Sequence, residues 1–534
     1  MSEHPWWKSA VVYQIYPRSF ADASGDGVGD LAGITSKVPY LADVLGVDAI
    51  WMSPFYPSPQ KDFGYDVADH ADVAPEHGSL EDFDALMAAC RAHGLRVIVD
   101  FVPNHTSDQH AWFAESRSAR TSAKRDWYVW ADPSPDGGPP NNWLSVFGGS
   151  AWEWDATTKQ YYLHSFLTEQ PDLNWRNPEV RAAQHDVLRF WMDRGVSGFR
   201  IDVAHYIAKD PELRDNPAAV AEDGEGWFKD LGTYDSQSHL YDKGHPDVHA
   251  FFRELRSVFD EYPDTYSIGE IHEDDPGAWV SYLGTGADEL HQVFDFSLLY
   301  APWDADSLRD LLDRQEAILP EGAWPNHVLG NHDEPRLAFR RGVDAARVGA
   351  MLLLTSRGTP TLYYGDELGM TQPVIPPEQQ LDPWGRTGEV VGRDGCRTPM
   401  QWDTSAHAGF SPEGTPSTWL PVHADHVTRN VASQLDDADS ILNLHRRLLA
   451  ARKASPALHL GDYAALDGLP DGVLGWERRH GDDRRVVILS LATRYEFIDG
   501  ISGTIEVATT IHREGESVDG RLLLAAHEGV VVRP

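Results

Sequence analysis

The chain has 534 residues and a formal net charge of −38, and because such an acidic surface repels nucleic acid and anionic membranes, we expect neither as a partner. Only two cysteines occur, Cys90 and Cys396, which excludes a disulfide framework, although the two could pair with each other. The N-terminus lacks the segments of a secretory signal, and no apolar run is long enough to span a membrane, so the sequence predicts a cytoplasmic protein.

Short apolar runs alternate with amphipathic helical patterns over the first two thirds of the chain. In residues 179–194, for example, Val180, Val187 and Trp191 share one helical face, and Gly195 follows as a C-cap. This alternation predicts βα units around a parallel sheet. Eight strands are predicted, at residues 11–16, 49–53, 96–102, 198–203, 267–270, 292–296, 327–330 and 361–365. Eight such units indicate an α/β fold of the (β/α)₈ TIM-barrel type.

Three stretches interrupt or follow the barrel pattern. Residues 106–175 are rich in Trp, Tyr, Gly and Pro, and we expect a small inserted domain B there, after the third strand. Residues 371–436 are irregular and either form a second wall of the barrel mouth or only cover the barrel. Short β-branched runs in residues 455–534 predict a separate C-terminal β-sandwich domain, which leaves 1–105 and 176–454 for the barrel.

Three of the predicted strands end in a carboxylate: Asp202, Glu270 and Asp333 follow the apolar runs that begin near residues 198, 266 and 328. The carboxyl ends of parallel strands meet at one rim of a barrel, so we expect the three acids to gather there. One strand-end acid alone is more often a helix cap or a solvated group. Three acids with nearby Arg or His side chains favour acid/base or glycosyl chemistry.

Four segments resemble the α-amylase superfamily, and within it the α-glucosidase and oligo-1,6-glucosidase group: residues 100–105 (DFVPNH), 198–205 (GFRIDVAH), 268–270 (IGE) and 330–333 (GNHD). The resemblance implies that Asp202 is the nucleophile, Glu270 the general acid and then base, and Asp333 the transition-state stabiliser. Arg200 lies two positions before Asp202, on the same face of its strand, and is expected to hold that acid ionised. Burial beside other acids is expected to raise the pKa of Glu270.

The same resemblance implies a set of substrate-binding residues. In the proteins of that group, two histidines hydrogen-bond the sugar in the cleavage subsite, three Phe residues form aromatic walls, and an arginine lies near the leaving sugar. The signature at residues 170–174 (QPDLN) is typical of exo-acting members. The implied positions are Asp62, Tyr65, His105, Phe147, Phe166, Gln170, Arg200, Val203, Phe294, His332 and Arg397. Val203 resembles the residue of α-1,6-preferring relatives, but residues 204–206 differ from theirs, so the linkage stays open.

Residues 22–30 (DASGDGVGD) place oxygen atoms at alternating positions around glycines, a spacing that suits a hard cation. The family uses this loop for a structural Ca²⁺ or Mg²⁺, and the implied ligands are Asp22, Ser24, Asp26, Val28 and Asp30. The loop is not a complete EF-hand, because Gly33 occupies the twelfth position. A plain Asx-rich turn is the alternative, and no catalytic cofactor is expected.

Together, these features predict a retaining, exo-acting α-glucosidase that hydrolyses terminal non-reducing glucose from short α-glucosides, with transglucosylation as a side activity. Its partner would be a small-molecule α-glucoside of the maltose or isomaltose type. A dedicated α-glucosyltransferase or a trehalose synthase-like isomerase is the nearest alternative. A catalytically inactive barrel that only binds carbohydrate is a third, although the intact Asp202, Glu270 and Asp333 argue against it.

Overall fold

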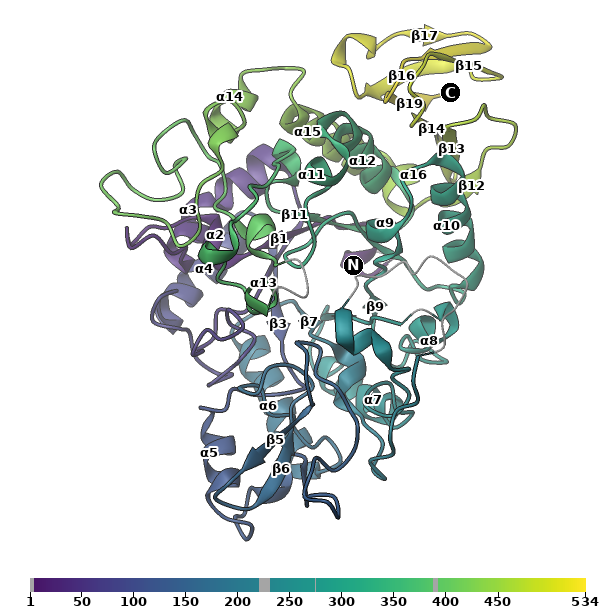
Figure 1. Cartoon of the computed structure of the whole chain (residues 1–534). Helices are drawn as coiled ribbons and strands as arrows, with labels where there is room; N and C mark the ends of the chain where they lie inside the picture. Colours follow the sequence, from purple (N-terminus) through teal and green to yellow (C-terminus); the bar gives the residue numbers. More distant parts are fainter. Residues whose placement is uncertain (1–3, 220–230, 274, 388–391) are drawn as a thin grey trace.

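The computed structural model describes residues 4–219, 231–273, 275–387 and 392–534 (Figure 1). Its centre is an eight-stranded parallel sheet with the order β10-β11-β1-β2-β3-β7-β8-β9. A parallel bridge between Asp295 and His327 brings the two ends of the sheet together into a nearly closed barrel. The strands are β1 (Val12–Ile15), β2 (Ala49–Met52), β3 (Arg96–Phe101), β7 (Gly198–Ile201), β8 (Tyr266–Gly269), β9 (Gln292–Val293), β10 (Asn326–Val328) and β11 (Thr359–Tyr363). The predicted (β/α)₈ barrel is confirmed, and each predicted strand overlaps an observed one.

The barrel strands form where short apolar runs can be buried on both faces. Every residue of β1, β2 and β11 is buried, as expected for parallel strands covered by helices. The helices between them have clear start signals. Ser79 and Asp82 form a capping box at the start of α4 (Leu80–Ala92), and Asn177 caps α6 (Pro178–Asp193). Gly195, with φ +98°, follows α6 in the left-handed conformation that lets the chain turn back into β7.

Helices surround the barrel (Figure 1). The longer ones are α3 (Leu31–Pro39), α4, α6, α7 (Val248–Phe259), α10 (Ala305–Ile318), α12 (Val343–Thr355) and α15 (Ile441–Ala454). The shorter ones are α1 (Trp6–Ser9), α2 (Pro17–Phe20), α8 (Pro276–Ser281), α9 (Ser297–Tyr300), α11 (Leu337–Arg341), α13 (Pro383–Thr387), α14 (Val431–Leu435) and α16 (Pro456–Leu460). Within the described residues, no helix is both long and apolar enough to cross a membrane.

A small three-stranded sheet interrupts the barrel between β3 and β7. Its antiparallel strands lie in the order β4 (Trp130–Ala131), β6 (Gln160–Leu163) and β5 (Trp152–Asp155), and α5 (Ala111–Ser118) precedes them. Trp143, Trp152 and Leu163 form a separate apolar cluster there. These elements fall inside the predicted insert, whose bounds at 106 and 175 stay a prediction.

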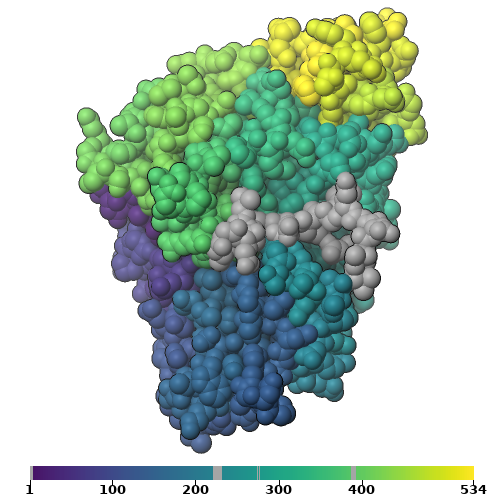
Figure 2. Space-filling model, viewed as in Figure 1, coloured from purple at the N-terminus to yellow at the C-terminus, as the bar shows by residue number. Residues whose placement is uncertain are grey.

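The C-terminal part of the chain is all-β, as predicted, and consists of two antiparallel sheets. Six strands pair in the order β12-β13-β14-β19-β16-β17, and β15 pairs with β18. Their bounds are β12 (Asp462–Ala465), β13 (Val473–His480), β14 (Asp483–Ser490), β15 (Glu496–Asp499), β16 (Gly503–Ala508), β17 (Ser517–Val518), β18 (Arg521–Leu524) and β19 (Gly529–Arg533). Figure 2 shows these sheets (yellow) and the insert (blue) at opposite ends of the molecule. The start of this domain at residue 455 stays a prediction.

Candidate active site

One arginine at the end of β7 contacts three carboxylates from three neighbouring strands. The Nη1 atom of Arg200 lies 2.6 Å from Asp100 Oδ1 and 2.8 Å from Asp202 Oδ1, while Nη2 lies 2.5 Å from Glu270 Oε2. All four residues are buried. We call Arg200, Asp100, Asp202 and Glu270 the Arg200 cluster. The sequence predicted three of its members as site residues and missed Asp100, which stands near the end of β3.

The charges of the Arg200 cluster do not balance, because one guanidinium faces three buried carboxyl groups. Burial raises the pKa of Asp202 well above its usual range, and it raises that of Asp100 to about 7 against the opposing effect of Arg200. For Glu270, burial also raises the pKa, but Arg200 and a hydrogen bond from His272 outweigh it and lower the value to about 2. These directions are opposite to the expectations of an ionised Asp202 and of a raised pKa for Glu270, which stay predictions. The physical reason is that Arg200 is shared among three acids, so the cluster retains a proton as a unit.

Asp333 follows β10 and is held by two arginines. Its Oδ1 accepts hydrogen bonds from Arg397 Nη2 at 2.8 Å and from Arg393 Nη1 at 3.2 Å. The side chain of Asp333 is 24% exposed, whereas that of Arg397 is fully buried. Arg397 also donates from Nε to the His332 carbonyl at 2.7 Å. Arg393, which the sequence did not single out, also donates to Asp62 Oδ1 at 2.7 Å and to Asp382 Oδ1 at 2.7 Å.

The two predicted histidines lie in the same site with their rings buried. The Nε2 atom of His332 lies 2.7 Å from Tyr65 Oη, and the two rings stack with centroids 5.5 Å apart. Gln170 Nε2 lies 3.1 Å from His105 Nε2 and donates to Asp62 Oδ2 at 3.2 Å. Burial lowers the pKa of His332 to about 3 and that of His105 to about 4, so both rings are neutral near pH 7. Neutral rings with polar edges suit sugar hydroxyl groups.

Aromatic rings from separate segments line one side of the site. The Phe147 ring lies 5.0 Å from that of Trp384 and 6.5 Å from that of Phe166, which in turn lies 5.1 Å from Tyr206. Phe147 and Phe166 belong to the insert, and Trp384 belongs to the irregular stretch 371–436. With Arg393 and Arg397, Trp384 places that stretch at the site, so the stretch is a wall. Sequence reasoning missed Trp384 and Tyr206, since each is a lone aromatic in an irregular segment.

Phe294 and Val203 lie in buried apolar clusters. The ring of Phe294 is buried, with centroids 5.4 Å from Trp51 and 5.6 Å from Phe296. Val203 has a φ of +34°, a left-handed conformation that is costly for a β-branched residue. Its backbone N–H donates to Glu270 Oε2 at 3.1 Å. The strained backbone thus directs a donor at one of the proposed catalytic carboxylates.

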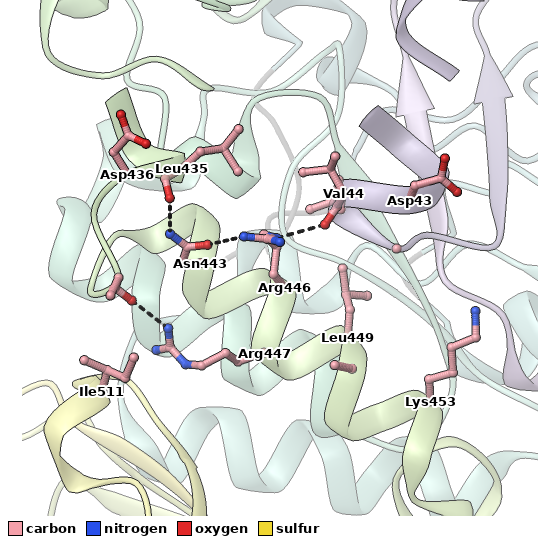
Figure 3. A pocket seen from close by; sticks show the side chains of 14 residues that line it. Asp43, Val44, Leu435, Asp436, Asn443, Arg446, Arg447, Leu449, Lys453 and Ile511 are labelled. Carbon is pink, nitrogen blue, oxygen red and sulfur yellow. Dashed lines mark hydrogen bonds between the residues drawn. The ribbon is translucent and has the colours of Figure 1, made fainter. Parts of the chain in front are cut away.

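The proposed catalytic residues do not line the larger of two cavities. A small cavity of about 10 Å³ is lined by residues that include Arg200, Glu270 and Asp333. A larger one of about 630 Å³ lies along α15 (Figure 3). There, Arg446 donates to Val44 O at 2.9 Å and to Asn443 Oδ1 at 2.6 Å. That cavity is lined by no aromatic ring and by no residue of the Arg200 cluster. We therefore place the active site at the smaller cavity.

The predicted cation loop uses its acids as hydrogen-bond acceptors. Asp22 accepts from the backbone N–H groups of Gly25 at 2.7 Å and Gly27 at 2.9 Å. Asp30 accepts from Ser24 N at 2.9 Å and from Gly33 N at 2.6 Å, where it caps α3. Among the described residues, no group of three or more His, Cys, Asp and Glu side chains could hold a metal. The structural Ca²⁺ or Mg²⁺ stays a prediction.

Comparisons with known proteins identify the family of the chain. Residues 14–461 match the family model described as alpha amylase, catalytic domain. A probable alpha-glucosidase of Rhizobium meliloti (strain 1021) is 46% identical over 502 residues, which cover 92% of this chain and 90% of that protein. An oligo-1,6-glucosidase of Parageobacillus thermoglucosidasius is 37% identical over 530 residues, covering 92% and 91%. A crystal structure of an alpha-glucosyl transfer enzyme superposes with a TM-score of 0.91 at 43% identity, covering 99% of this chain and 100% of that one.

Proposed function

This chain belongs to the α-amylase family of glycoside hydrolases, with α-glucosidases among its relatives, and we propose that it removes terminal non-reducing glucose from short α-glucosides with retention of configuration. The observation that carries the proposal is the contact of one guanidinium, Arg200, with both Asp202 and Glu270. A retaining glycosidase needs two carboxyl groups close together, one to attack the sugar and one to move a proton.

The proposed reaction has two steps. In the first, a carboxylate oxygen of Asp202 forms a bond to the anomeric carbon, the glycosidic C–O bond breaks, and Glu270 gives its proton to the leaving oxygen. In the second, Glu270 takes a proton from a water molecule, which attacks the anomeric carbon and releases Asp202. Asp333, held by two arginines beside the cavity, stabilises the positive charge that develops on the sugar ring.

The electrostatics of the Arg200 cluster add a condition to this mechanism. The nucleophile must be ionised and the acid protonated, but in the structure burial favours a proton on Asp202, and Arg200 favours the carboxylate of Glu270. Both groups contact the same guanidinium, so a proton can move from one to the other without changing the net charge of the cluster. The proposed mechanism requires this proton to be on Glu270 when substrate is bound.

Exo-action is supported by the residues that close one side of the site. Trp384 Nε1 lies 3.4 Å from Val146 O, which joins the stretch after β11 to the insert. Arg393 joins the same stretch to Asp62, on the segment after β2. Hydrogen bonds that connect these three segments around the site favour a pocket for one terminal sugar over an open groove. The bound sugar would meet the neutral edges of His105 and His332, with Asp62, Tyr65 and Gln170 beside them.

Glucosyl transfer is the second candidate, and the similarity to an alpha-glucosyl transfer enzyme favours it as at least a side activity. A transferase or an isomerase of the trehalose synthase type would use the same covalent step and differ only in the acceptor. Incubation with maltose, isomaltose and sucrose, followed by identification of every product, separates these activities. We expect glucose as the main product from at least one disaccharide. Trehalose or longer oligosaccharides as main products would overturn hydrolysis, and no reaction at all would favour an inactive carbohydrate-binding barrel.

A further inference from the structure

His272 contacts the proposed acid/base residue directly. It lies two positions beyond Glu270, and its Nε2 atom is 2.9 Å from Glu270 Oε1. The imidazole stacks on Phe296, with centroids 4.9 Å apart and planes inclined by 8°. The His272 side chain is 37% exposed, compared with 7% for Glu270. A stacked ring that reaches solvent therefore sits against one oxygen of a buried carboxyl group.

The two oxygen atoms of Glu270 have different partners. Oε2 accepts from Arg200 Nη2 at 2.5 Å and from the backbone N–H of Val203 at 3.1 Å. Oε1 is the atom that faces His272. A proton on Oε2 would point at two donors, so a protonated Glu270 must carry its proton on Oε1. The proton that a general acid gives to the leaving group is thus placed at the contact with His272.

We propose that His272 is a positioning residue which, by donating from Nε2 to Oε1, holds Glu270 as a carboxylate between turnovers and sets the pH above which the enzyme loses its general acid. The inference rests on the acid/base role proposed for Glu270. The direction agrees with the electrostatics, since burial raises the pKa of Glu270 but Arg200 and then His272 lower it. The same hydrogen bond favours the second step of the reaction, which needs Glu270 as a base.

Other charged groups also surround the pair. Lys243 Nζ, on the segment after η4 (Gly232–Ser236), donates to the His272 carbonyl at 3.3 Å. The ring of His205, in η3 (Ala204–Ile207), lies 6.0 Å from that of His272. Asp333, beyond β10, raises the pKa of Glu270, while Arg200 lowers it, and Glu273 follows His272 in the chain. Among these residues, His272 is the one with a side chain against Oε1, so its replacement should act on that oxygen.

The test is the pH dependence of kcat/KM for maltose, which reports groups of the free enzyme. Because the Arg200 cluster holds its proton as a unit, the basic limb reports the loss of that proton. In His272→Ala the loss of the donor favours this proton on Glu270, so the protonated cluster survives to higher pH and the basic limb of the profile moves up by about one pH unit. His272→Gln returns a neutral N–H donor near the same point and should bring the limb back toward its wild-type position. His272→Asn is too short to reach Oε1 and should behave like His272→Ala.

A second His–carboxylate pair provides the control. His249, on α7, lies 2.8 Å from Glu289 with a 28% exposed side chain, and neither residue belongs to the Arg200 cluster. His249→Ala should leave the profile unchanged. The proposal is overturned if the basic limb stays in place in both His272→Ala and His272→Asn, or if it moves to lower pH. Glu270→Gln distinguishes failure of the His272 proposal from failure of the acid/base role of Glu270. If that variant still cleaves maltose at the wild-type rate, the acid/base role is refuted, whatever the His272 variants show.

Discussion

Asp62 and Arg393 are joined by a hydrogen bond of 2.7 Å between Oδ1 and Nη2, although 331 positions separate them in the chain. The same guanidinium contacts Asp382 and Asp333, and it lies over the Trp384 ring with its carbon 4.5 Å from the centroid. One cation therefore fixes the segment after β2, the acid after β10 and the wall after β11 relative to one another.

Arg393→Lys tests this relationship. A single ammonium cannot reproduce the planar, forked contacts that a guanidinium makes with three carboxylates, so two acids of the site lose a partner. We expect kcat/KM for maltose to fall about 100-fold, which corresponds to about 2.7 kcal/mol. Arg386→Lys, an exposed change in the same stretch, is the matched control and should keep wild-type activity. A loss of less than threefold in Arg393→Lys would show that the guanidinium does not position the site.

The proposed division of labour between Asp202 and Glu270 predicts different substrate dependence. Glu270→Gln should lower the rate of the first step far more with maltose than with an aryl α-glucoside, because a good leaving group needs little protonation. Asp202→Ala should abolish turnover of both substrates while the melting temperature shows a folded protein. Single-turnover rates with the two substrates give the comparison. Equal losses in Glu270→Gln would argue against a general acid, and residual wild-type activity in Asp202→Ala would argue against a nucleophile.

Trp384→Ala should weaken substrate binding more than chemistry. Trp384 packs against Phe147 and closes the side of the site between the insert and the stretch after β11. The loss of such an aromatic contact costs about 1–1.5 kcal/mol, so KM for maltose should rise about 10-fold with a smaller change in kcat. Trp154→Ala, which removes a 40% exposed ring of the insert, is the control. A fall in kcat at constant KM would show instead that Trp384 acts on the catalytic step.

The barrel and two of the three acids of the Arg200 cluster, Asp202 and Glu270, could be predicted from the sequence because both depend on local patterns. Buried parallel strands appear as short apolar runs, and an acid that ends such a run must lie at the rim. Asp100 carries the same signal near the end of β3 and could have been found in this way. The predicted chain order of strands and helices also places the insert, since a long segment without helical periodicity cannot be part of the barrel.

The electrostatic state of the site could not be predicted in this way. Arg200 stands two positions from Asp202, which suggests an ion pair between these two residues alone. In the structure the guanidinium also contacts Asp100 and Glu270. Sharing depends on distances between strands that a single sequence does not give. The contacts of Arg393 could not be predicted either, because its partner Asp62 lies 331 positions away in the chain. Arg397 was expected near a sugar, and the structure shows its fully buried side chain in contact with Asp333.

The cation prediction for residues 22–30 can be tested by thermal unfolding. The alternative of a plain Asx-rich turn, in which Asp22 and Asp30 accept backbone N–H groups, predicts the same melting temperature in a chelator and in millimolar Ca²⁺ or Mg²⁺. Asp26→Asn, which changes an exposed acid of the loop, should likewise leave it unchanged. A rise in melting temperature with added cation, lost in Asp26→Asn, would establish the metal site that the sequence predicted.

Glu367 should make the protein less stable as the pH rises through neutrality. Its carboxyl group is buried in η5 (Asp366–Leu368), where Tyr13 Oη donates at 2.8 Å and Tyr40 Oη at 3.0 Å. Burial raises the pKa of Glu367 from 4.5 to about 7, against the lowering effect of these hydrogen bonds. The folded protein therefore binds more protons than the unfolded chain between these values, so the free energy of unfolding falls as the pH rises from about 4.5 to about 7.

Glu367→Gln keeps the shape of the side chain but cannot ionise. At pH 5 the wild-type carboxyl group is also neutral in the folded state, so the two proteins should be closest in stability there. At pH 8 the wild type bears a buried charge, at a cost of up to about 3 kcal/mol, and the variant should gain in melting temperature relative to it. Glu81→Gln, at an exposed position on α4, should show a difference from wild type that does not vary with pH. If the difference for Glu367→Gln is the same at pH 5 and pH 8, the raised pKa is refuted, because subtraction of the two proteins at each pH cancels the titrating groups that do not interact with Glu367.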